Sequence, residues 1–395
     1  MREELLQFIW RFCYFKQSHL FTEAGEAIEI LSPGELNTDQ RPDFRNARIR
    51  IGGILREGPV ELHIAASDWA RHGHDGDLHY QGVILHVVWE DDGGPPDIPV
   101  LVLQHRVSKL LLGLYEKWMN SQLFIPCERQ LIQVEASVWK GWKEQLLLAR
   151  LYQRAAVIRG WLEQNQQHWE ETMWWLMARS LGLPVNGDAF EALARSIPLR
   201  LLARHRQEPV RMEALLLGQA GMLEEGAGRL QKEYQFLKTR HKLKAIAEPV
   251  LFSRMRPAHF PGRRLVQLAR LFSDGESWFA RIKEADSPRV LEEALRIKGL
   301  GATMKRGIMI NAFVPMLFTY GWLRDEPDYR EKALSWLREG ETERNSIISN
   351  WQRLGVSAET AADSQALLEL KKNYCKTRKC LDCAIGQTLL GLPSS

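Results

Sequence analysis

The stretch RPDFRNARIRIGGILREGPVELHIAASDWARHGHDGDLHYQGVILHVVW, residues 41–89, decides the fold of the N-terminal part of the chain. Its short runs of Val, Ile and Leu alternate with Gly and Pro turns, which is typical of β-strands. An amphipathic helix is expected before it, over residues 3–16. Strands are expected over residues 27–31, 47–51, 60–65, 83–89 and 100–103, with a short helix capped by the Ser67 side chain between the third and the fourth.

The second part of the chain has a different periodicity. From about Val107 the apolar residues recur at helical spacing to the end, broken by Gly and Pro. We therefore predict an α+β N-terminal domain over residues 1–110, with a mixed sheet and flanking helices, and a mostly α-helical C-terminal domain over residues 111–395. Helices are expected over residues 134–164, 169–181, 212–217, 265–272, 291–297, 329–339 and 359–374.

Charge is spread unevenly between these two parts. Residues 1–110 hold 11 of the 53 Lys and Arg residues but 17 of the 49 Asp and Glu residues, so the remainder is basic. This split suits a carboxylate metal site beside a domain that attracts phosphate, although solvated helices also carry Lys and Arg. The most apolar run, residues 307–322, contains Asn311 and Pro315, and the first residues do not resemble a signal peptide. We expect a cytoplasmic protein without a membrane partner.

Two acidic residues and a histidine occupy positions that neighbouring strands would bring together. Asp43 follows a proline and precedes one strand, while Glu61 and His63 point to the same face of the next. Two carboxylates are normal ligands for Mg²⁺ or Mn²⁺, which activates water and stabilises phosphoryl charge. We expect His63 to be a general base or a further ligand, and Glu35 to be an outer carboxylate. The alternative is that Asp43 caps a turn and Glu61-Leu62-His63 faces solvent.

This order of residues resembles the PD-(D/E)XK nuclease superfamily over roughly the first 105 residues. The resemblance implies a restriction-endonuclease-like core, namely a helix, three strands, a helix and a strand, with metal on Asp43 and Glu61. It also implies a metal-dependent nuclease. The chain departs from the family pattern at His63, where lysine is usual, and the departure allows an inactive descendant that only binds nucleic acid.

A histidine-rich turn follows these strands. Trp69 with His72-Gly73-His74 resembles the Trp-Xaa-Xaa-His-Gly-His segment of mismatch-type nicking endonucleases, which implies histidines that assist a metal-bound water. His72 and His74 are therefore expected at the divalent site, although a His-Xaa-His pair near Asp residues can also bind Zn²⁺ or Mn²⁺ by itself. The alternative is a surface loop that happens to be rich in histidine. His86, alone in an apolar strand, is expected to be a hydrogen-bonded core residue.

Cysteines gather near the C-terminus, as Cys375-Xaa4-Cys380-Xaa2-Cys383. In a reducing compartment closely spaced cysteines indicate metal binding rather than disulfides, and unliganded thiols are the alternative. Cys127 is the expected fourth ligand, with Asp382 or a distant histidine as the other choices. The spacing resembles cluster segments of iron-sulfur DNA repair enzymes, which implies a 4Fe-4S cluster, and Zn²⁺ is equally permitted.

Basic residues interleaved with aromatic residues indicate a nucleic-acid partner, because arginine pairs with phosphate and an exposed ring stacks on a base. The expected contacts are Lys238, Arg240, Arg254, Arg256, Arg263 and Arg264.

The whole chain resembles an uncharacterised bacterial family known only by a domain-of-unknown-function label, which supplies no activity. The segments that carry this resemblance over nearly the full length are 34–37, 42–44, 67–74, 83–88 and the C-terminal cysteine segment.

Phosphate-binding Gly-rich loops, dinucleotide fingerprints and nucleophile elbows do not occur in the sequence. The sequence thus predicts a metal-dependent nuclease, or a nuclease-derived protein, that acts on DNA or RNA. A non-catalytic nucleic-acid-binding or scaffold protein with a structural metal site is one alternative. A metal-dependent hydrolase of a small substrate, with a His/Asp centre, is the other.

Overall fold

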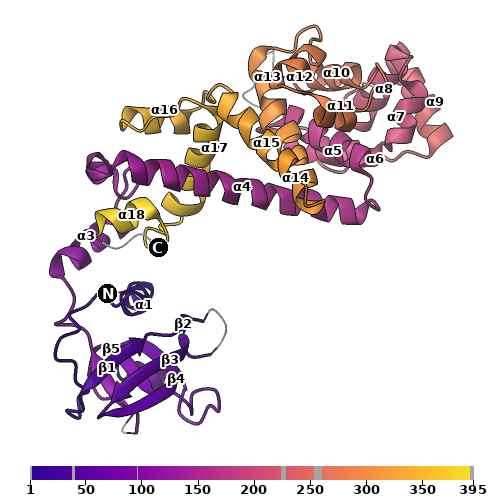
Figure 1. Cartoon of the computed structure of the whole chain (residues 1–395). Coiled ribbons are helices and arrows are strands. Elements are labelled where there is room, and N and C mark those ends of the chain that lie inside the picture. The colour runs from indigo at the N-terminus through magenta and orange to yellow at the C-terminus, as the bar shows by residue number, and fades with distance from the viewer. Residues whose placement is uncertain (1, 38–40, 96, 224–227, 253–259, 392–395) are drawn as a thin grey trace. The chain divides into compact units, whose positions relative to one another are not determined.

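The chain forms two compact units, Met1–Trp142 with Leu370–Ser395, and Lys143–Glu369. Helix α4 (Ala136–Gln164) begins in the first unit and continues in the second. The structure is a computed structural model, and it describes residues 2–37, 41–95, 97–223, 228–252 and 260–391 (Figure 1). None of the helices in these ranges is long and apolar enough to cross a membrane.

The first unit is built on a mixed sheet, as the sequence predicts. Its strands follow the order β1-β3-β4-β5-β6, and β2 also pairs with β3. Strand β3 is antiparallel to its three partners, whereas β4 is parallel to β5 and β5 is parallel to β6. The strands are β1 (Ile28–Ser32), β2 (Glu35–Leu36), β3 (Phe44–Ile51), β4 (Ile54–Ala65), β5 (Leu85–Glu90) and β6 (Val100–Val102).

Strands β3 and β4 form a hairpin that is longer than predicted. Gly52 and Gly53 have φ of +59° and +85°, the backbone that a two-residue hairpin turn requires and that glycine adopts without strain. The half of β4 next to this turn is largely exposed, and from Val60 to His63 the strand is buried on both faces. Strand propensity predicts only the buried half of β4. The exposed half forms a strand because it pairs with β3.

Two short helices accompany the sheet. Helix α1 (Glu3–Arg11) contacts β4 through its apolar face, and the indole of Trp10 donates to the carbonyl of Pro33 at 3.0 Å. It ends earlier than the predicted residue 16 and Cys13, just beyond it, has φ +53°. Helix α2 (Asp68–Arg71) lies between β4 and β5.

The predicted cap of helix α2 is wrong. The Ser67 side chain makes no capping hydrogen bond, and its hydroxyl donates to the Asp92 carboxylate at 2.6 Å instead.

The rest of the first unit is helical and includes the C-terminal segment. Arg378 attaches that segment by donating two hydrogen bonds, to the carbonyls of Trp118 at 2.7 Å and Ser121 at 2.6 Å. The remaining elements are α3 (Lys109–Met119), the 3₁₀-helix η1 (Glu128–Gln133), the π-helix η4 (Leu370–Cys375) and α18 (Ala384–Leu389).

The described residues of the second unit form helices joined by loops, with an isolated β-bridge between Glu341 and Thr360, which confirms a mostly α-helical C-terminal part. Helix α5 (Trp169–Gly182) is buried over most of its surface, as expected of a helix whose charged residues are confined to its first and last turns. The other elements are α6 (Gly187–Ser196), α7 (Leu199–His205), α8 (Pro209–Gln219), α9 (Arg229–His241), α10 (Pro261–Leu271), α11 (Trp278–Glu284), α12 (Pro288–Ala294), α13 (Ala302–Ile308), the π-helix η3 (Met309–Phe313), α14 (Val314–Leu323), α15 (Pro327–Glu339), α16 (Ser346–Arg353) and α17 (Ala361–Glu369).

Candidate metal centre

Two carboxylates meet where β3 begins beside the buried half of β4. The backbone N–H of Asp43 donates to Glu61 Oε2 at 2.9 Å, and the N–H of Leu62 donates to Asp43 Oδ2 at 3.1 Å. The antiparallel register, which pairs Phe44 with Val60, fixes this exchange. The sheet therefore brings together the acidic pair that the sequence predicts.

Burial disfavours ionisation of these two carboxyl groups when no cation is bound. It raises the pKa of both carboxyl groups well above their usual range, and the charge of Asp43 raises the pKa of Glu61 further. Glu3 on α1 adds to the effect as a third nearby acid. On the other side of Asp43, Gln7 donates to Oδ1 at 2.7 Å.

Four imidazoles gather beside the carboxylates. His63 Nδ1 lies 2.8 Å from His86 Nε2, and His63 Nε2 lies 3.2 Å from His72 Nδ1. The carboxylate of Glu61 reaches the same group, because its Oε1 lies 3.4 Å from His74 Nε2 and 3.6 Å from His63 Nε2.

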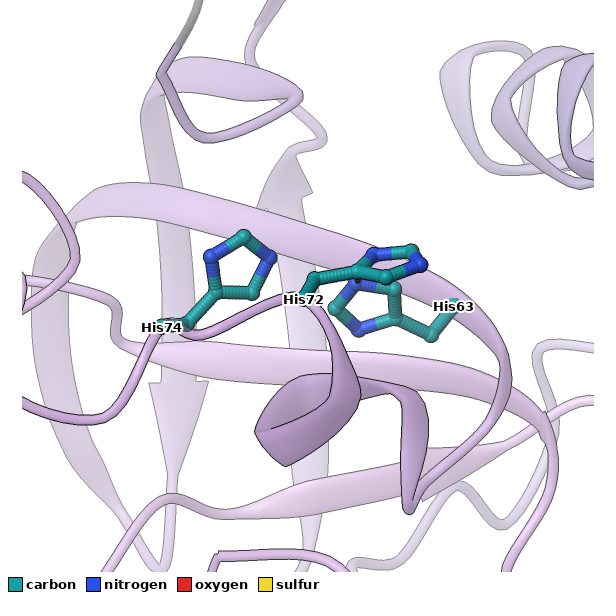
Figure 2. A group of neighbouring side chains, drawn as sticks. All are labelled: His63, His72 and His74. Carbon is teal, nitrogen blue, oxygen red and sulfur yellow. Dashed lines mark hydrogen bonds between the residues drawn. The ribbon is translucent and has the colours of Figure 1, made fainter.

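Figure 2 shows the rings of His63, His72 and His74 clustered between β4 and the turn after α2. Their ligand atoms all lie within 4.8 Å of one another. His63 is buried, His74 is half-buried and His72 is exposed. The cluster thus runs from the sheet to solvent.

Burial disfavours the charged form of three of these imidazoles, those of His63, His74 and His86. Burial lowers the pKa of His63 to about 3, with the neighbouring histidines adding to the effect, and burial lowers the pKa of His86 to about 4. The pKa of His74 is also lowered, mainly by burial. Neutral imidazole is the form that binds metal. Since both ring nitrogens of His63 face other imidazoles, the geometry favours the ligand role of His63 over the general-base role.

Aromatic packing fixes the histidine-rich turn. Trp69 on α2 contacts the rings of His63 and His74, and its indole donates to Asp75 at 3.1 Å. Tyr80 stacks on His74 with ring centroids 3.8 Å apart. The turn is therefore an ordered wall of the site.

Three residues at this site were missed or assigned otherwise by the sequence reasoning. Gln7 and Glu3 come from α1, and only the docking of that helix on the sheet places them near Asp43. His86 lies in the core, as predicted, but it is opposite Glu61 in the parallel register and its Nδ1 has no partner. Gln7 is a polar residue within the apolar run of α1, and this position was the feature of the sequence that could have indicated a role at the site.

Other predicted site residues lie elsewhere. The carboxylate of Glu35 is exposed and pairs with Arg45 at 3.2 Å, so it is outside the buried cluster. Arg254 and Arg256 lie outside the described residues. Arg263 and Arg240 are exposed, and Lys238 is half-buried at the end of α9.

Arg264 requires a correction. It is 6% exposed and donates to Gln267 at 3.0 Å, so it is unable to contact nucleic acid from this position. Helical spacing puts it on the same face of α10 as the buried residues Leu268 and Leu271.

The chain belongs to the family described as protein of unknown function DUF2851, whose model matches residues 3–299. The matched range includes the acidic pair and the histidine cluster, whereas Cys375, Cys380 and Cys383 lie beyond it, so the family match is shorter than the predicted near-full-length resemblance. No curated protein and no solved structure matches the chain.

Proposed function

We propose that this chain is a metal-dependent phosphodiesterase that cleaves DNA or RNA, or a descendant of such a nuclease. The observation that carries the proposal is the part-buried hydrogen bond from the Asp43 N–H to Glu61, beside three imidazoles with ligand atoms within 4.8 Å. A structural role alone gives no reason to bury two acids together, since each raises the cost of ionising the other.

The residues fit a divalent cation. Two carboxylates and several neutral imidazoles suit Mn²⁺ or Zn²⁺ better than Mg²⁺, which prefers oxygen ligands alone. His74 Nε2 is buried and has no hydrogen-bond partner, although it lies near Glu61 Oε1. Asp43, Glu61, His63, His72 and His74 would hold the ion, and the ion would supply an activated water and stabilise phosphoryl charge.

The surrounding residues orient these ligands. His86 faces His63 Nδ1 and thereby limits the orientations of the ring, as outer hydrogen bonds commonly do in metal sites. Gln7 and the N–H of Leu62 hold the two oxygens of Asp43. His72 is the exposed member of the cluster, so its side of the ion is the one that a solvent water would reach.

The order of elements supports the nuclease reading. Helix α1, three longer strands, helix α2 and strand β5 follow the order that the PD-(D/E)XK resemblance implies, with short β2 inserted. Asp43 stands at the start of the second long strand and Glu61 lies within the third. Strand β5 is parallel to β4, on the side away from β3.

A basic cavity next to the carboxylates supports a phosphate-bearing substrate. The cavity measures about 350 Å³, and its lining includes four cationic residues, Arg2, Arg11, Arg378 and Lys379, and two acidic ones, Glu4 and Asp382. Gln7 also lines it, and this is the side chain that donates to Asp43. Gln7 thus separates the cationic side chains of this cavity from the proposed catalytic carboxylates. Cations in this position could bind the phosphate groups of a nucleic acid.

A cleavage assay tests the proposal. The purified chain, freed of metal by chelation, is incubated with duplex DNA, single-stranded DNA and RNA in the presence of Mn²⁺, Mg²⁺ or Zn²⁺. We expect cleavage of at least one substrate with Mn²⁺ and none with chelator. Salt-dependent binding without cleavage would instead support the binding-only descendant, and no affinity at low salt would favour a small-molecule hydrolase.

A separate prediction concerns the basic residues of the second unit. Arg240→Ala and Arg263→Ala are each expected to weaken nucleic-acid binding and to reduce the slope of log affinity against log salt by about 1, because each removes one phosphate contact. Fluorescence anisotropy at several salt concentrations measures both quantities. Arg264→Ala is the matched control, since this buried neighbour should leave the salt slope unchanged. Equal slopes for all three variants and the wild type would contradict the assignment.

A further inference from the structure

All five cysteines lie in the first unit, and three of them stand at the ends of short helical elements. Cys127 is the N-cap residue of η1 and Cys383 is the N-cap residue of α18, and these two elements contact each other. Cys375 ends η4, and Cys380 precedes Cys383 by three residues.

The C-terminal segment is anchored in the place that this grouping needs. Arg378 binds the carbonyls of Trp118 and Ser121, and Lys371 donates to the carbonyl of Phe124. These contacts join the segment that contains Cys375, Cys380 and Cys383 to the chain just before Cys127. The grouping therefore does not depend on a disulfide, and all five cysteines are free thiols.

Close packing fixes the turn between the last two cysteines and α18. A Cβ atom at Gly386 would lie 2.1 Å from the carbonyl oxygen of Cys380, so only glycine allows this approach. Cys127, Cys380 and Cys383 are each 7% exposed.

The contact between η1 and α18 places Cys127 and Cys383 on adjoining elements, and the thiols also influence one another electrostatically. Burial is the first cause that raises the pKa of Cys127, and Cys383 and Cys380 raise it further. Burial and the other three thiols likewise raise the pKa of Cys375. The backbone N–H groups of Gly386 and Ile385 lower the pKa of Cys383 in part, as donors to a thiolate do.

The spacing of the sulfurs distinguishes a single ion from a cluster. Tetrahedral Zn²⁺ at about 2.3 Å from each ligand holds its sulfurs about 3.8 Å apart. In the described part of the chain, the three histidines are the set whose ligand atoms all lie within 4.8 Å, so no three of the four sulfurs are that close. An iron-sulfur cluster holds its cysteines further apart, because an iron atom stands between each thiolate and the cluster centre.

We propose that Cys127, Cys375, Cys380 and Cys383 bind one 4Fe-4S cluster that joins the C-terminal segment to the residues before α4. The proposal is independent of the nuclease assignment, because it concerns other residues and a structural role. The cluster replaces the missing covalent link between two segments that are far apart in sequence.

The test is metal analysis of the full chain, purified without oxygen and reconstituted with iron and sulfide. We expect iron and inorganic sulfide at about four of each per chain, with broad visible absorbance that dithionite bleaches. Inorganic sulfide separates this site from the histidine cluster, since iron bound by histidine and carboxylate carries none. About one Zn²⁺ per chain without visible absorbance, or no metal after reconstitution, would overturn the proposal.

Variants assign the ligands. Cys127→Ser is expected to lose most of the sulfide and the visible absorbance, whereas Cys13→Ser, at the one cysteine outside the group, should retain both. Circular dichroism checks that each variant is folded. If Cys127→Ser keeps the full cluster, the four-cysteine site is wrong, and if this variant does not fold, the metal content of the wild-type chain still decides.

Discussion

Asp43→Asn and Glu61→Gln are each expected to lower the rate of metal-dependent cleavage on the order of 100-fold or more. Each change removes one anionic ligand but keeps the shape of the side chain, so the loss falls on metal binding and on stabilisation of the transition state. The measurement is kcat/KM with Mn²⁺ on whichever nucleic acid the wild-type chain cleaves, with metal affinity determined in parallel.

Glu35→Gln is the matched control for both variants. Glu35 is also a carboxylate of the same sheet, but it is exposed and pairs with Arg45, so its loss should change the rate by less than about twofold. A rate that falls equally in all three variants would point to a general effect of charge. Undiminished cleavage by Asp43→Asn and Glu61→Gln would remove these residues from the mechanism.

Much of the site could be predicted from local sequence rules. The two-residue period of a strand puts Glu61 and His63 on one face, and this follows from the sequence alone. Asp43 could be placed near them because an antiparallel hairpin joins consecutive strands, and Gly52-Gly53 marks the turn. Strand periodicity and hairpin pairing therefore predict that Asp43, Glu61 and His63 lie close together.

The positions of His86 and Gln7 depend on contacts between elements, which sequence periodicity does not encode. His86 meets His63 because β5 is parallel to β4, and the register of a parallel pair is set by its long crossover connection, not by a tight turn. Gln7 reaches Asp43 only because the apolar face of α1 packs on β4. These are tertiary placements, and single-residue propensities carry no information about them.

The burial of Arg264, in contrast, could be predicted from the helical periodicity of the sequence. An arginine that lies at helical spacing from Leu268 and Leu271 belongs to the apolar face of its helix, and the structure buries it there. The number of basic residues in a segment indicates its charge, but it does not show which face of the helix each residue occupies.

The metal-free protein is expected to lose stability as pH rises from about 6.5 to 8.5, on the order of 2 kcal/mol. Burial raises the folded-state pKa of Asp43 to about 7 and that of Glu61 to about 8, whereas both groups titrate near 4 when unfolded. Across this window the folded state holds protons that the unfolded state has lost, so raising the pH favours unfolding. His63 and His86, with lowered pKa values, act mainly below this window.

Thermal unfolding in chelator, followed between pH 6.5 and 8.5, measures this slope. The double variant Asp43→Asn/Glu61→Gln should have a nearly constant midpoint over the same range, because neither amide titrates. Added Mn²⁺ should reverse the slope in the wild type, since the cation binds the ionised pair and its affinity rises as the protons leave. If the chelated wild type and the double variant show the same pH dependence, the two carboxyl groups are not buried as an acidic pair, and the metal centre loses the observation on which it rests.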